Sequence, residues 1–185
     1  MSDALLNATL RELSETGYAG TTVARIARSA GTSKQAIYRR FPDKTALAAA
    51  ALANGFLAFR PEPPLRGSVA EDLRRYLVGL AKALTETPLG GAIRSLSSYR
   101  DVSEFAVVFA EAESGQRLAL RQILIATPFE ADMETRIDLL LGLVSFGTLV
   151  RGHIPSADDL EKAIHLVLGL VAPRDPRPFS GLPGT

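Results

Sequence analysis

Residues 22–41 read TVARIARSAGTSKQAIYRRF, and this stretch decides the fold of the amino-terminal part of the chain. Gly31 stands at its centre, and glycine tolerates the positive φ that a tight turn needs, so a break between two short helices is expected there. Thr22 and Ser33 stand where the hydroxyls of two helix N-caps are expected. A proline follows Phe41 and biases it away from helical backbone, which predicts the end of the second helix. The stretch therefore predicts a helix-turn-helix.

Apolar residues recur at helical spacing through most of the chain, and no sustained period-two run is found, so the predicted fold class is all-α. The Pro-rich stretch 60–67 cannot continue a helix and is the predicted linker. A three-helix helix-turn-helix domain with its connecting helix is expected at 1–59, and a C-terminal helical bundle at 68–172. Four further prolines predict a disordered tail over 173–185. The helices are expected at 3–16, 22–29, 33–41, 43–59, 68–87, 89–96, 101–126, 131–151 and 156–171.

Several of these helices have recognisable ends. Gly17 is suited to stop the first helix, and Asp43 is suited to cap the fourth. Gly115 weakens the expected continuity of the helix at 101–126. Ser68 with Glu71 forms a capping-box pattern that predicts the start of a later helix. Asp101 with Glu104 and Ser156 with Asp159 are expected to open two further helices.

The positive charge of the chain is concentrated in the helix-turn-helix, although the formal net charge of the whole chain is only +1. A charge run alone is usually a solvated surface, but basic side chains on a helix-turn-helix are suited to a polyanion such as double-stranded DNA. The stretch 25–44 contains one acidic residue, Asp43, and six basic residues: Arg25, Arg28, Lys34, Arg39, Arg40 and Lys44.

Composition argues against several other classes of protein. The chain has no Cys, and its two histidines, His153 and His165, form no recognisable metal-ligand set, so no metal and no cofactor are expected. No Gly-rich phosphate loop and no Gly-x-Ser-x-Gly elbow appears, so we do not expect an enzyme. No apolar run reaches the length of a membrane span and no signal-peptide pattern is seen, so we expect a soluble cytoplasmic protein without a membrane partner.

Over residues 8–47 the chain resembles the DNA-binding signature of the tetracycline-repressor (TetR) family. Members of that family are typically dimeric, ligand-responsive repressors with a variable all-helical C-terminal domain. Glu12 departs from the pattern, because the family usually has an apolar residue there, and the short amino terminus makes a basic arm in the minor groove unexpected. The matching residues are Gly17-Tyr18, Thr21-Thr22-Val23, Ile26-Ala27, Ala30-Gly31-Thr32-Ser33, Ile37-Tyr38, Phe41-Pro42-Asp43-Lys44 and Leu47.

The resemblance implies a role for particular side chains of the helix-turn-helix. Hydroxyls and ammonium groups are usual phosphate donors, while Gln reads adenine and Arg or Lys reads guanine, so physical chemistry agrees with these roles. Arg25 and Arg40 complete the predicted DNA-binding set. Phosphate contacts are implied for Thr22, Thr32, Tyr38 and Lys44, and positions at or near the groove for Ser33, Lys34, Gln35 and Arg39.

A small-molecule site is expected between helices of the bundle, because ligand sites in helical bundles are mostly apolar cavities. Each residue taken alone is as well suited to plain core packing. Polar anchors could come from Arg94, Arg100, Ser145 and Tyr99. The predicted ligand-binding residues are Leu77, Tyr99, Phe105, Phe109 and Phe146.

A homodimer is expected because the segment 139–150 carries no charge and a helix that is apolar all round needs cover on every side. The interface is predicted to combine 131–151 with 156–171, in a four-helix arrangement between two copies. The predicted interface residues are Leu140, Val144, Gly147, Ile164 and Leu168.

Together these features predict a ligand-responsive transcriptional regulator. The resemblance to the TetR family implies that it is a repressor. It would bind a palindromic operator as a homodimer and be released by a small, mostly apolar molecule. The alternative is a constitutive or architectural DNA-binding dimer with no small-molecule ligand. An enclosed cavity among the bundle helices would favour the first reading, and a solidly packed core would favour the second.

Overall fold

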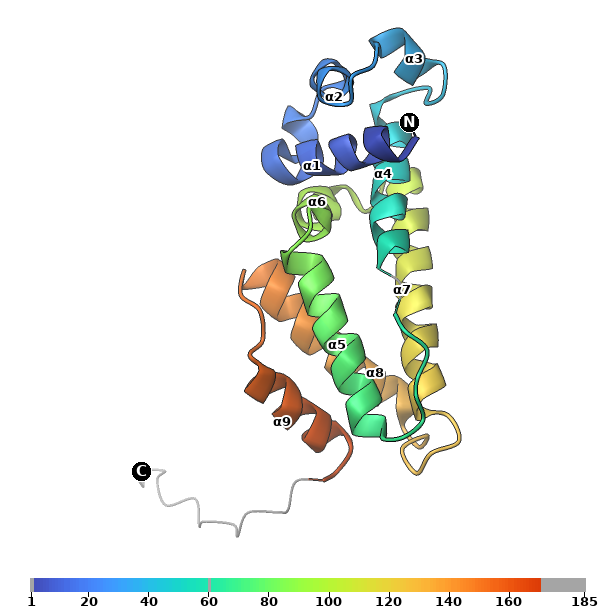
Figure 1. The fold of residues 1–185 in the computed structure, drawn as a ribbon, viewed down its shortest axis with the longest axis vertical. Helices are drawn as coiled ribbons and strands as arrows, with labels where there is room; N and C mark the ends of the chain where they lie inside the picture. Colours follow the sequence, from blue (N-terminus) through green and yellow to red (C-terminus); the bar gives the residue numbers. More distant parts are fainter. Residues whose placement is uncertain (1, 60, 171–185) are drawn as a thin grey trace, which may run out of the picture.

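The computed structural model describes residues 2–59 and 61–170, and every regular element within them is helical (Figure 1), so the predicted all-α fold class is confirmed. The predicted tail at 173–185 lies outside the described residues. A 3₁₀ turn, η1 (Ser97–Tyr99), follows α6, and a π-helical turn, η2 (Phe146–Val150), follows α8. The helices are α1 (Ser2–Gly20), α2 (Val23–Ser29), α3 (Lys34–Tyr38), α4 (Lys44–Ala58), α5 (Val69–Thr85), α6 (Leu89–Leu96), α7 (Ser103–Leu124), α8 (Met133–Ser145) and α9 (Ala157–Val167).

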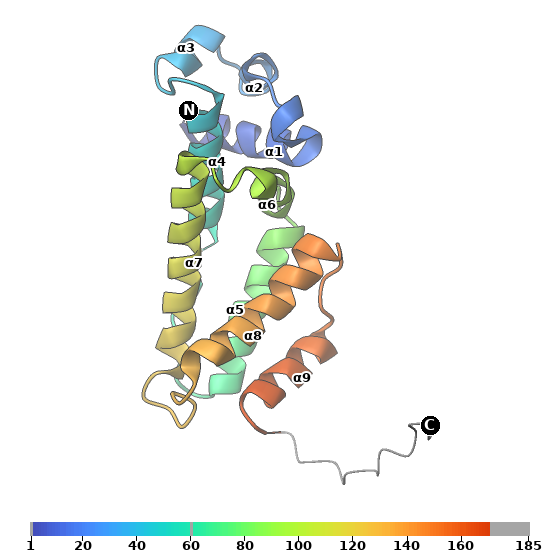
Figure 2. The ribbon, with the colours of Figure 1, turned by 180° about the vertical axis from the view of Figure 1, so that it is seen from behind.

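Helices α1 to α3 form one end of the molecule, which we call the head, and α5, α7, α8 and α9 form the opposite end (Figure 1). Helix α6 packs directly beneath α1, and α7 runs alongside α4, as both views show (Figures 1 and 2). The head is therefore joined to the rest of the molecule through two neighbours, α4 and α6. Within the described residues, none of the helices has both the length and the apolar character needed to cross a bilayer.

Most of the predicted helix ends are confirmed. Gly17 and Gly31 both have positive φ, 71° and 63°, so each breaks the helical path as expected. Asp43 caps α4 through a hydrogen bond that its Oδ1 accepts from the N–H of Ala46 at 2.8 Å. Ser156 and Asp159 form both hydrogen bonds of a capping box at α9. At α5 the Ser68 Oγ accepts from the N–H of Glu71.

Three predicted boundaries are corrected by the structure. Helix α3 ends at Tyr38 and not at Phe41, because the chain tightens into a turn in which the N–H of Arg40 donates to the carbonyl of Ile37. Helix α7 has Val102, and not Asp101, at its N-cap, with extended backbone and no side-chain cap. The helix continues through Gly115 without interruption.

The third correction concerns α9, which ends at Val167 and not at 171. Gly169 takes φ 65°, the left-handed conformation that commonly ends helices. The N–H of Leu170 donates to the carbonyl of His165, and that of Gly169 to the carbonyl of Leu166. These are the two hydrogen bonds of a Schellman motif, so the backbone itself ends the helix.

Two clusters of buried apolar side chains hold the fold together, and α1 and α4 contribute to both. The small cluster in the head contains Leu5 of α1 and Leu47 of α4, together with Ile26 and Ile37. Leu13 of α1 and Leu52 of α4 belong instead to the large cluster that extends through α5 to α9. A displacement of α1 or α4 therefore affects both clusters. Of the linker predicted at 60–67, residues 61–67 fall in the irregular segment before α5 and residue 60 lies outside the described residues. The division into domains stays a prediction.

Candidate nucleic-acid interface

Helices α2 and α3 are held at a defined angle by their caps and by two buried isoleucines. The Thr22 hydroxyl accepts from the N–H of Arg25 at 3.3 Å, and the Ser33 hydroxyl accepts from the N–H of Ala36 at 3.1 Å. Ile26 and Ile37 are completely or almost completely buried in the cluster between the two helices. The turn around Gly31 lies open, with nothing within 4 Å of the position where a Cβ would stand. The helix-turn-helix is therefore a preorganised unit.

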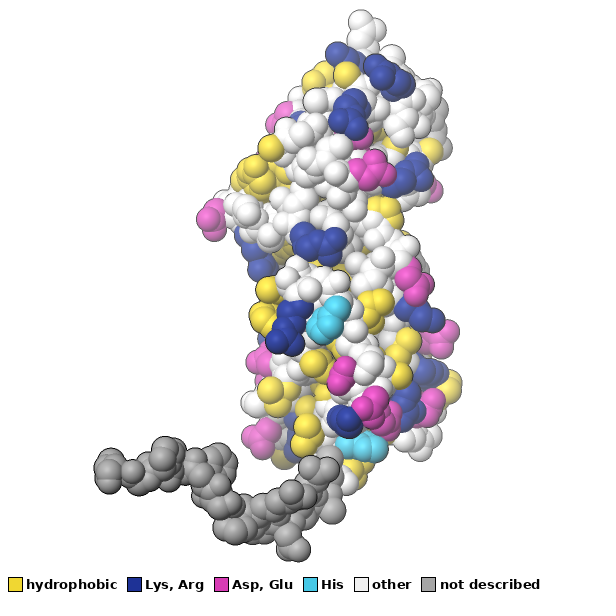
Figure 3. Space-filling view, turned by 90° about the vertical axis from the view of Figure 1, so that its left-hand side faces the viewer, with side chains coloured by type: hydrophobic (Ala, Val, Ile, Leu, Met, Phe, Trp, Pro, Cys, Tyr) yellow, Lys and Arg dark blue, Asp and Glu magenta, His cyan; other side chains and the backbone are white. Residues whose placement is uncertain are grey.

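The outward side of this unit carries most of the predicted DNA-binding side chains. Tyr38 of α3 is 51% exposed, which is unusual for an aromatic ring in a small helical unit. Lys and Arg side chains are visible over the end of the molecule that contains α1 to α3 (Figure 3). Thr32 and Lys44 are half-buried. The exposed members of the set are Thr22, Arg25, Ser33, Lys34, Gln35, Tyr38, Arg39 and Arg40.

Lys44 has a structural role that the sequence did not indicate. Its Nζ donates to the carbonyls of Tyr18 at 2.8 Å and Thr21 at 3.3 Å, at the carboxyl end of α1. The same atom lies 4.3 Å from the centroid of the Tyr18 ring, in cation–π geometry. An ammonium has three donors, so one remains for a phosphate. Lys44 ties α4 to α1, and its phosphate contact stays a prediction.

Glu12, which departs from the family pattern, is buried in the head and forms an ion pair with Arg25 of α2. A Glu12 carboxylate oxygen lies 2.8 Å from Arg25 Nε. Burial of an unpaired carboxylate would be costly, so the guanidinium explains how the acid is accommodated where an apolar residue is usual. The Arg25 side chain stays 53% exposed, so its other nitrogens face outward from the pair.

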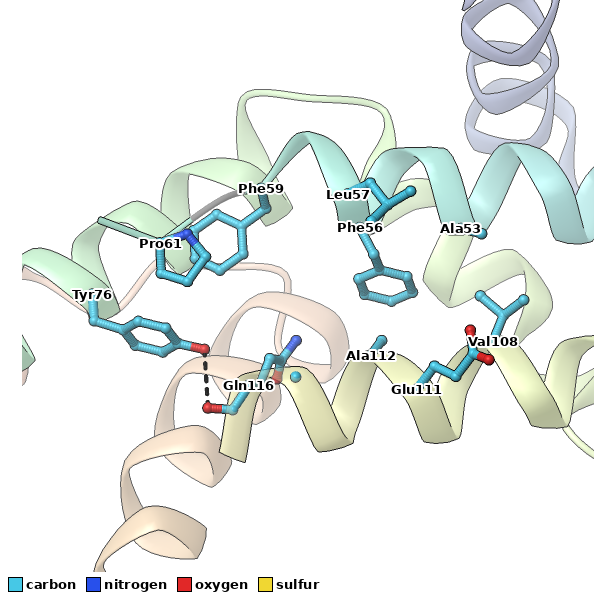
Figure 4. A pocket seen from close by; sticks show the side chains of 11 residues that line it. Ala53, Phe56, Leu57, Phe59, Pro61, Tyr76, Val108, Glu111, Ala112 and Gln116 are labelled. Carbon is cyan, nitrogen blue, oxygen red and sulfur yellow. Dashed lines mark hydrogen bonds between the residues drawn. The ribbon is translucent and has the colours of Figure 1, made fainter. Parts of the chain in front are cut away.

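Two open cavities lie between the helices below the head. We call the first the α4–α7 cavity, and its volume is about 550 Å³. It is lined by Phe56 of α4, Phe59 at the C-cap of α4, Tyr76 of α5, and Glu111 and Gln116 of α7 (Figure 4). The Tyr76 hydroxyl points toward the backbone carbonyl of Gln116 and donates to it at 3.5 Å. Burial of Tyr76 raises the pKa of its hydroxyl, which therefore remains a neutral donor.

We call the second the arginine cavity: its volume is about 470 Å³, and its lining includes Arg94 and Arg100 together with Arg117. Phe56 and Gln116 line both cavities, so the two are neighbours across these side chains. Both cavities are open to solvent, so neither is the enclosed cavity that would favour a ligand-responsive regulator.

The five predicted ligand-binding residues are not brought together. Phe109 lines the arginine cavity, but Phe146 lies on the outer side of η2 and is 54% exposed. Leu77 and Phe105 are completely buried in the large core cluster. Tyr99 packs edge-on against Tyr18, with ring centroids 4.7 Å apart. The polar anchors were better placed by the sequence, since Arg94, Arg100 and Ser145 all line the arginine cavity.

The predicted dimer-interface residues face the wrong way. All five are buried by their own chain: Leu140, Val144, Gly147, Ile164 and Leu168. A side chain that its own protomer covers has no surface left to give to a partner, so these residues belong to the core. The apolar side chains that α8, η2 and α9 do expose are Leu139, Phe146, Val150 and Leu166.

These exposed side chains flank a groove of about 770 Å³ between α8 and α9, lined by Leu139, Phe146 and Leu166 among others. Figure 3 views the molecule from the side that carries α9 and the end of α8, where hydrophobic side chains are interspersed with charged ones. Helical periodicity identified α8 as apolar all round, but it could not tell which side the protomer itself covers.

Sequence reasoning missed Phe56, Gln116 and Arg117 as cavity residues. The sequence gives the angular position of these residues around their helices. A cavity forms only where α4, α5, α7 and α8 separate from one another, and tertiary packing determines that separation. The unequal charges of the two cavities were equally hidden, because Glu111 and Arg117 stand on the same helix.

Comparison with known proteins supports the reading of the head. Residues 5–51 match the family of bacterial regulatory proteins called the tetR family. Over 71 residues the chain is 44% identical to an uncharacterized HTH-type transcriptional regulator of Mycobacterium bovis. That match covers 38% of this chain and 35% of the relative, so the chain spans about a third of the length of the curated relative that it matches.

Solved structures are similar to the chain over most of its length. A tetR-family transcriptional regulator from Streptomyces coelicolor superimposes with a TM-score of 0.74 at 20% identity, covering 91% of this chain and 79% of that one. AibR in complex with isovaleryl coenzyme A and operator DNA gives a TM-score of 0.66 at 16% identity, covering 89% of this chain and 96% of that one. At these identities the likeness establishes the fold alone. The helix-turn-helix segment at residues 5–51 therefore matches that of the tetR family of bacterial regulatory proteins.

Proposed function

We propose that the protein is a transcriptional repressor that binds a palindromic operator as a homodimer and releases it when a small molecule binds between the lower helices. The observation that carries the proposal is the exposed outer side of α3, where Gln35, Tyr38 and Arg39 project from a rigid helix-turn-helix. A second helix presented in this way enters the major groove of DNA in proteins of this architecture.

The side chains of the head divide into two kinds of DNA contact. Tyr38, Thr22 and Thr32 carry hydroxyls suited to phosphate oxygens, which set position without reading sequence. Gln35 carries the paired acceptor and donor that read adenine in the major groove, and Arg39 carries the forked donors that read guanine. The same face gains further groups from neighbouring residues: positive charge from Arg25, Lys34 and Arg40, and a hydroxyl from Ser33.

The homodimer is supported by the outer side of α8, η2 and α9. Leu139, Val150 and Leu166 are 60%, 69% and 67% exposed, and together with Phe146 they make an apolar surface beside a groove. A second copy of the chain is the occupant that a palindromic site requires, because two-fold symmetric DNA is read by a two-fold symmetric protein.

The ligand response is supported by the position of the cavities. The arginine cavity is lined by residues of α4 and α6, the two elements that join the head to the rest of the molecule. A structural neighbour binds an acyl-coenzyme A together with operator DNA, which is the kind of dual binding proposed here. Because the two cavities are open to solvent, they also fit the alternative, a constitutive or architectural DNA-binding dimer.

The test is to select a preferred duplex from random DNA with the full-length protein, and to measure its affinity by fluorescence anisotropy. We expect two half-sites whose centres lie about one helical turn, or a multiple of it, apart. Arg39→Ala should lower the affinity for the selected duplex by about 5- to 150-fold, since a bidentate base contact contributes about 1–3 kcal/mol.

Lys82→Ala is the matched control, because it removes one exposed positive charge from α5, outside the helix-turn-helix. The control should bind as the unmodified protein does. If selection yields no preferred sequence, or if Lys82→Ala weakens binding as much as Arg39→Ala, the proposed operator reading is wrong.

A further inference from the structure

We propose that the arginine cavity takes an amphipathic carboxylate, with the carboxylate held by Arg94 and Arg100 and an apolar chain lying against the inner wall. The inference rests on the proposed function only in assuming that this cavity is where a ligand binds. The sequence predicted only a small, mostly apolar ligand. The present inference adds the chemical class of that ligand.

The first argument is the distribution of charge in the cavity. Its lining contains three arginines and two acids, Glu113 and Asp138. Both acids are already paired with Arg117, whose Nε lies 3.2 Å from a Glu113 oxygen and whose Nη2 lies close to Asp138. Arg117 also pairs with Glu134 of α8, so its charge is more than neutralised by its neighbours. The unbalanced charge of the cavity is therefore positive.

The second argument is the state of the two remaining guanidinium groups. Among residues 2–59 and 61–170, no carboxylate forms an ion pair with Arg94 or Arg100. Arg94 Nη1 donates to the carbonyl of Thr148 at 3.4 Å, which holds the group against η2. Arg100 lies over the ring of Phe109, with its Cζ 5.0 Å from the ring centroid.

Both groups are thus positioned by neutral partners and keep most of their five donors. Guanidinium groups bind carboxylates through paired N–H donors, and such charge-assisted bonds are about twice as strong as neutral ones. Because Arg100 lies over an aromatic ring, its positive charge stands directly beside an apolar surface. An amphipathic carboxylate matches this arrangement, since its negative head adjoins an apolar chain.

The third argument is the apolar wall behind the arginines. Leu80, Leu84 and Ile93 are buried, and Phe56, Phe109 and Leu141 are half-buried where they line the cavity. A volume of about 470 Å³ lies within the usual range for small-molecule sites. A charged head alone would leave this wall in water, and an apolar molecule without a head would leave the two guanidinium groups unmatched.

The neighbouring α4–α7 cavity supplies an internal contrast. Among the described residues of its lining, the one charged side chain is the carboxylate of Glu111, so the charge of these residues is negative (Figure 4). A cationic amphiphile would favour that cavity and an anionic one the arginine cavity. The sign of the head group is therefore the property that an experiment should vary.

The experiment uses the full chain and three probes with the same ten-carbon tail: decanoate, decanol and decylamine, each below its micelle concentration. Binding is measured by isothermal titration calorimetry at low salt. We expect decanoate to bind at least tenfold more tightly than decanol, and decylamine not to compete with decanoate. Arg94→Gln and Arg100→Gln should each weaken decanoate by about tenfold or more, while changing decanol by less than about twofold.

Arg11→Gln is the matched control, because it removes an exposed arginine of α1 that lines neither cavity. Arg94 and Arg100 are exposed, so the variants should unfold at the temperature of the unmodified protein, and this is checked by circular dichroism. The proposal is wrong if decanoate does not bind, if decylamine displaces decanoate, or if decanoate affinity survives both substitutions.

Release of operator DNA is measured separately with the same probe. If decanoate binds through the arginines and operator affinity is unchanged, the carboxylate site stands and the proposed ligand response fails. If the head groups are ranked differently but one of the probes still releases DNA, the ligand response stands and the carboxylate class fails.

Discussion

The backbone N–H of Tyr18 donates a hydrogen bond to Ser95 Oγ, with 2.6 Å between the two atoms. Tyr18 lies at the carboxyl end of α1, and Ser95 lies on α6 next to Arg94 of the arginine cavity. The Tyr18 hydroxyl in turn shares a hydrogen bond of 2.8 Å with Thr45 Oγ1 on α4. One residue of the head is therefore bonded to α6 and to α4, two of the elements that line the cavity.

This arrangement predicts that Ser95 transmits part of the ligand response. Ser95→Ala should leave the operator affinity of the unliganded protein within about twofold, and should reduce the ligand-induced loss of affinity, which is typically 5- to 150-fold in coupled systems. Operator titrations with and without ligand measure this coupling directly. Ser98→Ala, an exposed serine of η1, is the control. Coupling that is the same in Ser95→Ala and Ser98→Ala would show that the hydrogen bond between Tyr18 and Ser95 does not carry the response.

The close contact between α6 and α1 predicts a stability difference between two glycine substitutions. A Cβ on Gly91 would stand 2.0 Å from Ser14 Oγ and 3.1 Å from Ser14 Cα, so Gly91→Ala must push α6 away from α1. We expect it to lower the free energy of unfolding by about 1–3 kcal/mol. Gly115→Ala on α7 meets nothing within 4 Å and should be neutral or raise stability by up to about 1 kcal/mol. Urea denaturation measures both, and an equal cost at the two positions would contradict the packing.

Asp72 predicts a loss of stability in acid. Its buried carboxylate accepts hydrogen bonds from the N–H groups of Leu65 and Arg66, each at 3.0 Å, and pairs with Arg75. Burial raises the pKa of Asp72, but the two backbone hydrogen bonds and Arg75 outweigh it and lower the pKa below its ordinary value. Because the folded pKa lies below the unfolded one, the stabilisation is complete above the unfolded pKa and is lost as the pH falls through the folded pKa.

Asp72→Asn should therefore lower the free energy of unfolding by about 1–3 kcal/mol at pH 7. The difference in unfolding free energy between the variant and the unmodified protein should shrink below about pH 4, because the carboxyl of the unfolded chain becomes protonated there. Denaturation curves from pH 7 to pH 3 test this, with the exposed Asp101→Asn as control. A difference that is constant across the whole pH range would mean that the charge of Asp72 contributes nothing.

The two kinds of DNA contact predict different effects on specificity. Tyr38→Phe should weaken binding to selected and random duplexes alike, because a phosphate contact carries no sequence information. Gln35→Ala should weaken binding to the selected duplex alone and relax the preference at one base position of each half-site. Anisotropy titrations on both duplexes across a salt series separate the two. The assignment is inverted if Tyr38→Phe changes base preference and Gln35→Ala does not.

The tie between Lys44 and α1 changes what a substitution there is expected to do. Removing the ammonium leaves the carbonyls of Tyr18 and Thr21 without their donor, so Lys44→Ala should lower thermal stability as well as DNA affinity. If a phosphate contact is also lost, the slope of log affinity against log salt should fall by about one per subunit. An unchanged slope with reduced stability would leave Lys44 with the structural role alone.

The outer side of α8 and α9 predicts where a charge prevents dimer formation. Leu139→Glu or Leu166→Glu should yield a folded monomer, because a carboxylate would be buried without a partner in the interface. Val107→Glu, at an equally exposed apolar position on α7, is the matched control and should remain dimeric. Analytical ultracentrifugation with circular dichroism separates a monomer from an unfolded chain. A monomeric unmodified protein at micromolar concentration would rule out this interface.

The sequence by itself determined the local features of the fold, because they depend on neighbours in the chain. Gly17 and Gly31 take the positive φ that the absence of a Cβ permits, and Thr22, Ser33 and Asp43 cap the helices that follow them. The same locality explains why the family signature was readable over a short segment. The errors at helix ends have a different cause. The turn after Tyr38 and the Schellman motif at Gly169 depend on backbone hydrogen bonds that no single residue type predicts.

Tertiary structure alone decided which sides of the helices are covered. Leu140 and Leu139 are neighbours in an uncharged segment, yet Leu140 is fully buried by its own chain and Leu139 is 60% exposed. Periodicity gives the angular position of a side chain around its helix, but the direction of the core depends on where α5, α7 and α9 pack. Likewise Arg117 and Arg94 are the same residue type, and only packing supplies carboxylates to one and leaves the other to face the cavity without them.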